Sequence, residues 1–301
     1  MKKNNFYKMQ IGGLSDVTET VRVIEKSAAA HIHFLKKKVH ALSEYKQKIQ
    51  TTLERLSRFY WDDNHPLLQK RDYGQRVLLV VTGEKGIVGG LYHELINKVI
   101  TENKDYGLVW VIGNKGKKYL SEEGDIQAEH IFNSFNFDDL PQSEDIQKMA
   151  NRLFERFQET NLKNIDVLYT NFISLAEQNP TVAKFLPFNF IRDKSFDFDH
   201  ATVKAEDTLP NNLADGFPIF EHSKQLIFDE LLKKYINVSF AEIILEAKLS
   251  EFSARTVTAE SAVKQTQHLI KTFNRELFKS KHLTITQKQI ESFSVHQLTQ
   301  I

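Results

Sequence analysis

A glycine-rich segment, GEKGIVGG at residues 83–90, follows an apolar run and precedes a helical pattern. An α/β fold places phosphate-binding loops at such a position. A Walker A loop is excluded, because five residues separate Gly83 from Gly89 and no Lys-Ser or Lys-Thr follows. The dinucleotide pattern Gly-x-Gly-x-x-Gly is missing as well. We therefore predict that the turn brings a strand close to a helix, and we expect no cofactor.

Other side chains that could do chemistry are scattered. His31 and His33 lie two positions apart, and such residues do not share a helix face. His93 has no second histidine at helical spacing that would complete a zinc site. The chain has 0 cysteines and no Gly-x-Ser-x-Gly elbow, so metal binding is not expected and nucleophilic catalysis has no candidate. These patterns predict a mechanical or binding element rather than an enzyme.

The composition limits the classes of partner. Of the 301 residues 41% are hydrophobic and 26% are charged, and the formal net charge is +1, which predicts a soluble chain with no global attraction to nucleic acid. No apolar run approaches the roughly 20 residues that cross a bilayer, and the first residues lack the apolar stretch of a signal peptide. We expect a cytosolic chain without direct membrane insertion.

Long helices are predicted at both ends of the chain. In the first, from about Leu14 to Tyr60, apolar residues recur at steps of three and four, which gives one helical stripe. The last begins at Ser223, a candidate N-cap, and extends to about Gln297. Its seam keeps a four-three alternation and consists of Leu245, Leu249, Phe252, Thr256, Ala259, Val263, Thr266, Ile270, Phe273 and Leu277.

Each helix is too long for a compact domain to cover, so the two are predicted to pair with each other. A coiled coil of a dimeric scaffold is the alternative. Small residues in the seam, such as Thr256 and Ala259, favour the pair within one chain, since a dimerising zipper would prefer Leu there.

The register fails after Leu277, and the final turns are therefore predicted to leave the pair and to meet something different. Four residues with basic side chains lie there. They form either a solvated face or a surface for an acidic partner, and they are our candidate contact residues. The four are Lys279, Lys281, His282 and Lys288.

Between the helices, strands alternate with helical segments. Arg76–Val81, Tyr106–Gly113 and Asn164–Thr170 are predicted strands, and Ser143–Thr160 is a predicted amphipathic helix. The region 184–220 is predicted to contain loops and an edge strand. The predicted fold is a small Rossmann-like α/β domain with a mainly parallel sheet, plus a long antiparallel coiled coil. The predicted parts are residues 1–62, 73–220 and 221–301.

With this order established, several motifs resemble the gamma subunit of F-type ATP synthases. They are VVTGEKGIVGGL at 80–91, VLYTNFISLAEQNPTVAKFLPF at 167–188, FEHSKQLIFDELLKKYI at 220–236 and SEFSARTV at 250–257, followed in register by Ala262, Leu269-Ile270 and Ile285-Thr286-Gln287.

The chain departs from that family at named positions. Gly83 stands where the family usually has Ser. Phe278, Lys281-His282 and Lys288 stand where it commonly has Asn, Arg-Gln and Glu. The resemblance therefore indicates a divergent member.

The resemblance implies a central stalk inside three alpha and three beta subunits in a 3:3:1 complex, with an epsilon subunit and a membrane c-ring as further partners. It implies catalysis in the beta subunits and a peripheral location on the cytoplasmic face of the bacterial inner membrane. It also implies that Lys281 and His282 contact beta. A gamma-like shaft of a related rotary ATPase with another task, and a coiled-coil adaptor with an α/β head, are the alternatives.

Overall fold

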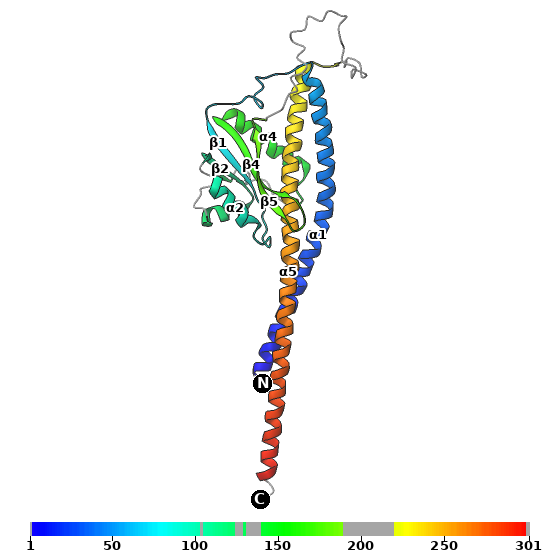
Figure 1. The fold of residues 1–301 in the computed structure, drawn as a ribbon, viewed down its shortest axis with the longest axis vertical. Helices are drawn as coiled ribbons and strands as arrows, with labels where there is room; N and C mark the ends of the chain where they lie inside the picture. Colours follow the sequence, from blue (N-terminus) through cyan, green and yellow to red (C-terminus); the bar gives the residue numbers. More distant parts are fainter. Residues whose placement is uncertain (1, 103–104, 124–128, 131–139, 189–219, 299–301) are drawn as a thin grey trace, which may run out of the picture. The chain divides into compact units, whose positions relative to one another are not determined.

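The computed structural model describes residues 2–102, 105–123, 129–130, 140–188 and 220–298 (Figure 1). They fall into two compact units. The first unit takes in the residues up to Ile32, Ile87–Gly89 and the residues from Phe252 onward, and the second takes in His33–Gly86 and Gly90–Glu251. The division into residues 1–62, 73–220 and 221–301 stays a prediction.

Both terminal helices are present. Helix α1 spans Lys2–Ser57 and α5 spans Lys224–Leu298, about 85 Å and about 110 Å of helix at ~1.5 Å per residue. Helix α1 begins earlier than predicted because it continues through Gly12 and Gly13, around which nothing crowds the backbone. The predicted N-cap is confirmed, since the Leu226 N–H donates to the Ser223 hydroxyl over 3.3 Å.

In the first unit, α1 and α5 pair in antiparallel fashion. The ring of Tyr7 lies 6.2 Å from that of Phe273, and the Thr18 hydroxyl donates to Thr266 over 3.0 Å, so residue numbers rise along one helix and fall along the other. Ala259 is completely buried, as the seam predicts. Two positions of the apolar stripe predicted for α1 are wrong, because Val17 is 49% exposed and Tyr45 is 40% exposed.

Within the second unit, α1 and α5 also pair in antiparallel fashion. Lys46 of α1 forms an ion pair with Glu242 of α5, and the Tyr235 hydroxyl donates to the Gln50 amide oxygen over 3.5 Å. At the start of α5, Phe228 is fully buried beneath aromatic residues that follow α1. This unit therefore contains the last part of α1, the first part of α5 and the sheet.

A five-stranded sheet has the order β3-β2-β1-β4-β5. Strands β1, β2, β3 and β4 pair in parallel and only β5 is antiparallel, which confirms the predicted mainly parallel α/β fold. The strands are Gln75–Val81 (β1), Leu108–Ile112 (β2), Glu129–His130 (β3), Leu162–Phe172 (β4) and Gln178–Leu186 (β5). The edge strand β5 begins before the region predicted for it, and residues 189–219 of that region lie outside the described residues.

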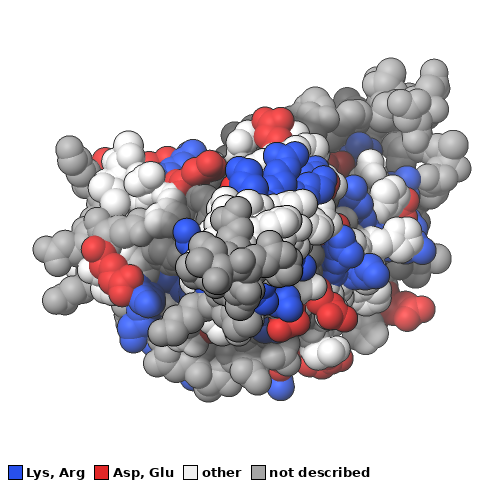
Figure 2. Space-filling model, turned by 90° about the horizontal axis from the view of Figure 1, so that it is seen from below, with Lys and Arg blue, Asp and Glu red and all other residues white. Residues whose placement is uncertain are grey.

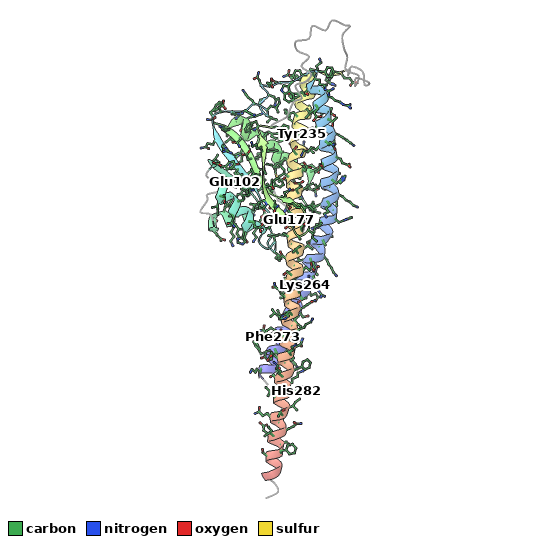
Figure 3. All side chains as sticks on the ribbon, in the orientation of Figure 1. Glu102, Glu177, Tyr235, Lys264, Phe273 and His282 are labelled. Atoms are coloured by element: carbon green, nitrogen blue, oxygen red, sulfur yellow. The ribbon has the colours of Figure 1, made fainter. Side chains whose placement is uncertain are left out.

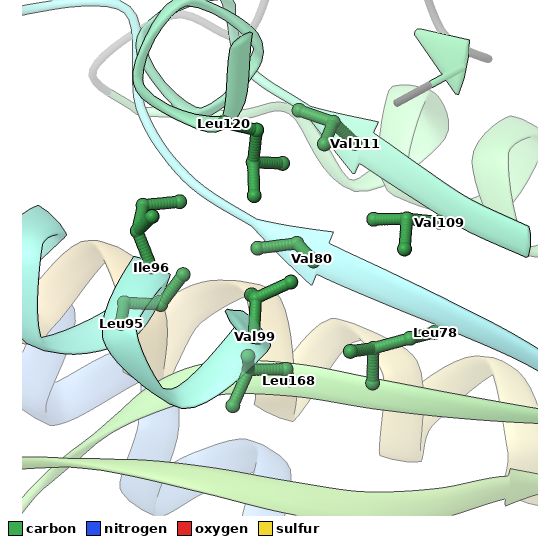
Figure 4. Close-up of a cluster of buried hydrophobic side chains, with 9 residues drawn as sticks. All are labelled: Leu78, Val80, Leu95, Ile96, Val99, Val109, Val111, Leu120 and Leu168. Carbon is green, nitrogen blue, oxygen red and sulfur yellow. The ribbon is translucent and has the colours of Figure 1, made fainter. Parts of the chain in front are cut away.

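Helices cover the sheet because its parallel strands are apolar on both faces. The helices are α2 (Leu91–Glu102), α3 (Asn114–Glu123) and α4 (Ser143–Glu159). Figure 4 shows one core cluster, in which side chains of α2 and α3 pack on β1, β2 and β4. Phe185 of β5 lies between Phe154 of α4 and Phe240 of α5, so α5 is itself part of the sheet's packing.

Candidate interaction surface on the last helix

Helix α5 leaves its partner after Leu277, which is 7% exposed. Residues 278–294 contain no buried side chain, as predicted from the loss of register. These residues, with four more whose side chains are not described, extend α5 by about 30 Å at ~1.5 Å per residue. We call residues 278–298 the tip. Figure 3 shows Phe273 beside α1 and His282 on the tip beyond it.

The four predicted contact residues are all exposed on the tip. Lys279 pairs with Glu276 one turn away, at 2.8 Å between Nζ and Oε1. The Lys281 Nζ lies 5.7 Å from the ring centroid of Phe278. Lys281 and Lys288 are seven positions apart, so they share one side of the helix, whereas Lys279 and His282 point elsewhere. The structure therefore brings together two of the four and separates the others.

Large apolar side chains on the tip were missed from the sequence. Their exposed fractions far exceed those of the paired seam, and such a concentration on one helix marks a protein contact surface. Their spacing was the available signal, since Phe278 and Ile285 are also seven positions apart. The residues are Phe278 (60% exposed), Leu283 (72%), Ile285 (54%), Ile290 (61%) and Phe293 (74%).

Figure 2 views the chain from below and shows Lys and Arg beside Asp and Glu on this face of the chain as a whole. The tip itself contains Lys279, Lys281 and Lys288 and one carboxylate, Glu291, so it offers a partner both exposed apolar side chains and a small positive charge.

The glycine-rich turn packs closely, as predicted. A Cβ at Gly83 would lie 2.5 Å from both the Glu251 Oε2 and the Tyr92 hydroxyl oxygen, and the Gly83 N–H donates to that hydroxyl over 2.9 Å. Glu84 accepts hydrogen bonds from the Asn114 backbone N–H at 3.2 Å and from its side-chain amide at 2.6 Å. A carboxylate of the chain itself therefore caps the start of α3.

The histidines of the sequence analysis have ordinary surroundings. His31 meets the Phe252 ring edge-on, with 4.6 Å between ring centroids. His93 lies 5.0 Å from the Tyr119 ring. Within the described ranges, no three His, Asp or Glu side chains are grouped so as to hold a metal ion. None of the helices described there combines the length and apolar character that a bilayer crossing needs.

Known proteins match this chain along almost its whole length. The family model described as ATP synthase matches residues 5–292. The ATP synthase gamma chain of Histophilus somni (strain 129Pt) is 24% identical over 286 residues and covers 93% of both chains, and that of Trichormus variabilis is 26% identical over 300 residues and covers 91% of both.

Solved structures share the fold. A rotor chain of the Euglena gracilis mitochondrial ATP synthase aligns with a TM-score of 0.56 at 14% identity, over 94% of this chain and 98% of that one. A chain from the central stalk and c-ring of the Tetrahymena thermophila enzyme aligns at 0.51 and 13% identity, over 81% and 99%. Together with the family model and the curated relatives, the paired terminal helices and the mainly parallel sheet lead to one assignment. The chain belongs to the ATP synthase gamma-chain family.

Proposed function

We propose that this chain is the central stalk of a rotary F-type ATP synthase and couples rotation of an ion-driven membrane ring to ATP synthesis or hydrolysis. One observation carries the proposal: α5 continues past its intramolecular partner for about 30 Å and exposes large apolar side chains there. An exposed apolar surface of this kind marks a site that a partner protein covers.

The partners follow from the related assemblies. Three alpha and three beta subunits surround the tip, and an epsilon subunit and the c-ring contact the chain elsewhere. Catalysis resides in beta, and this chain contributes no catalytic residue. The chain is peripheral, on the cytoplasmic face of the bacterial inner membrane; several of its relatives are bacterial gamma chains.

Coupling requires that each orientation of the shaft favour a different nucleotide state at each catalytic site. A surface that lies off the rotation axis can favour one nucleotide state at one site if it contacts one beta subunit at a time. The tip has such asymmetry, because Phe278, Lys281, Ile285 and Lys288 follow at steps of three and four and share one side of the helix, whereas Leu283 and Ile290 lie on another.

Co-expression with the cognate alpha and beta subunits tests this function. We expect a stable 3:3:1 complex with ATPase activity. A chain that instead self-associates and binds nucleotide without those subunits would establish the adaptor alternative.

The contact residues are tested within that complex. Lys281 and His282 engage polar loops of beta; Lys288 shares the side of the helix that carries Lys281, and Lys279 is the fourth proposed contact residue. Replacing Lys281 and His282 together by Ala should lower ATP hydrolysis and synthesis. His222→Ala with Lys224→Ala, a matched exposed pair at the opposite end of α5, is the control. Unchanged rates in the first double variant would rule out the role of Lys281 and His282.

A further inference from the structure

Helix α5 buries polar side chains where it packs on the sheet in the second unit. Lys248 is 1% exposed, Ser250 is fully buried and Glu251 is 3% exposed. A helix usually presents apolar residues to a sheet, and Lys and Glu are almost never fully buried unless they are paired. These three residues therefore do something that apolar packing does not.

Their contacts link the helix to the ends of two strands. The Lys248 Nζ lies 3.1 Å from the Glu251 Oε2, so the two charges compensate each other. The Ser250 hydroxyl donates to the backbone carbonyl of Thr170 in β4 over 2.8 Å. Gly83, two residues after the end of β1, is so close to the Glu251 carboxylate that no side-chain carbon fits between them.

The space that remains is small. A cavity of about 10 Å³ is lined by Gly83, Tyr92, Thr170, Lys248 and Glu251, among others. That volume suits roughly one water molecule and no larger ligand. The cluster is thus a close polar contact between helix and sheet rather than a binding pocket.

We propose that Lys248, Glu251 and Gly83 form a torque joint, which locks the α/β sheet to the shaft helix and transmits rotation between them. Apolar surfaces can slide because the hydrophobic effect is non-directional, whereas a buried ion pair and hydrogen bonds fix one register. Lys248, Glu251 and Gly83 take no part in catalysis and act by holding the helix and the sheet in one relative position. This inference rests on the proposed function.

The test uses the complete membrane-bound complex in inverted vesicles. ATP hydrolysis and ATP-driven ion pumping are measured together, and their ratio reports coupling. Glu251→Gln keeps the size of the side chain but removes the charge that compensates the buried Lys248 ammonium. We expect at least about a twofold lower ratio of pumping to hydrolysis, because the ion pair that fixes the register between helix and sheet is lost. Gly83→Ala should lower the ratio in the same way by forcing Glu251 away.

Glu260→Gln is the matched control. Glu260 pairs with Lys264 on the same helix, at 2.7 Å, but both side chains are more than half exposed. This variant should keep the wild-type ratio. A wild-type ratio in both Glu251→Gln and Gly83→Ala would overturn the torque joint.

A second variant distinguishes transmission from folding. Lys248→Met with Glu251→Leu replaces the pair by apolar side chains of similar volume, an exchange that often preserves stability. We expect assembled complexes whose ratio is still lowered about twofold. Full coupling in this variant would mean that packing alone suffices and would overturn the proposal. Failure of the wild-type chain to assemble or pump would instead refute the proposed function.

Discussion

The first and last parts of α5 contain similar types of residue but differ in how far those residues are buried. At the base, residues 224–251 bury Phe228, Phe240 and even Lys248. At the tip, Phe278 and Phe293 are mostly exposed. Both parts are helical and both contain lysines among aromatic residues.

The difference shows that one helix has two kinds of partner. The base is covered by α1 and the sheet of the same chain, so its side chains stabilise the fold. The tip has no such cover in the described structure, so its side chains are available to other subunits. Folding and assembly should therefore respond to substitutions in different parts of α5.

Truncating aromatic side chains tests this comparison with the largest effect. Phe240→Ala should lower the free energy of unfolding by about 3–5 kcal/mol, because it leaves a cavity between the helix and β5. Phe293→Ala should change it by less than about 0.5 kcal/mol. Urea unfolding followed by circular dichroism measures both values. Equal losses of unfolding free energy in the two variants would contradict the difference between the first part of α5 and the tip.

Two glycine-to-alanine substitutions should change the free energy of unfolding in opposite directions. Gly83→Ala should destabilise the chain by about 1–3 kcal/mol, because its Cβ has no room beside Glu251. Gly12→Ala should stabilise it by about 0.5–1 kcal/mol, because Gly12 lies in the open interior of α1 and alanine is the better helix former. The same urea titrations measure both, and a stabilising Gly83→Ala would disprove the close contact.

The base should also respond to pH through His65. Burial lowers the pKa of His65, with a smaller contribution from Lys233, and Asp229 and Asp62 only partly oppose this. The unfolded chain then binds more protons just below its histidine pKa of about 6.5, so stability is complete above that pH and is lost as pH falls through the lower folded value.

His65→Asn removes the titrating group, so unfolding free energies measured at several pH values should fall less steeply below about pH 6.5. Its amide oxygen can still accept the Leu67 N–H, which now donates to the imidazole Nδ1 over 3.2 Å. His222→Asn, at an exposed position just before α5, is the control for the substitution itself. If the unfolding free energy of His65→Asn depended on pH as steeply as that of the wild type, His65 would not be the group that lowers stability at acidic pH.

The smallest effect is expected next to the tip. Glu276→Gln breaks the exposed pair with Lys279, and the unfolding free energy should change by less than about 0.5 kcal/mol. Urea titration measures this change. A loss of several kcal/mol would mean that the last turns of the paired helices α1 and α5 contribute to folding as strongly as residues 224–251.

Local periodicity determined much of the fold from sequence. The helical repeat predicts the seam from Leu245 to Leu277, and hydroxyl capping predicts the start of α5 at Ser223. Short β-branched runs predict the three main strands. Each of these signals acts over a few residues. The end of the register at Leu277 also located the tip as the candidate surface. The particular contact residues there stay a prediction.

Only the tertiary structure decided which residues meet across long sequence separations. It placed Thr18 rather than Val17 against α5, and it buried Lys248 with Glu251 beside Gly83. A lysine in a helix pattern is expected in solvent, and its burial depends on a compensating charge and on close backbone from remote segments. Periodicity specifies which side of a helix turns inward, but the neighbours it meets are fixed only when the sheet and both helices pack together.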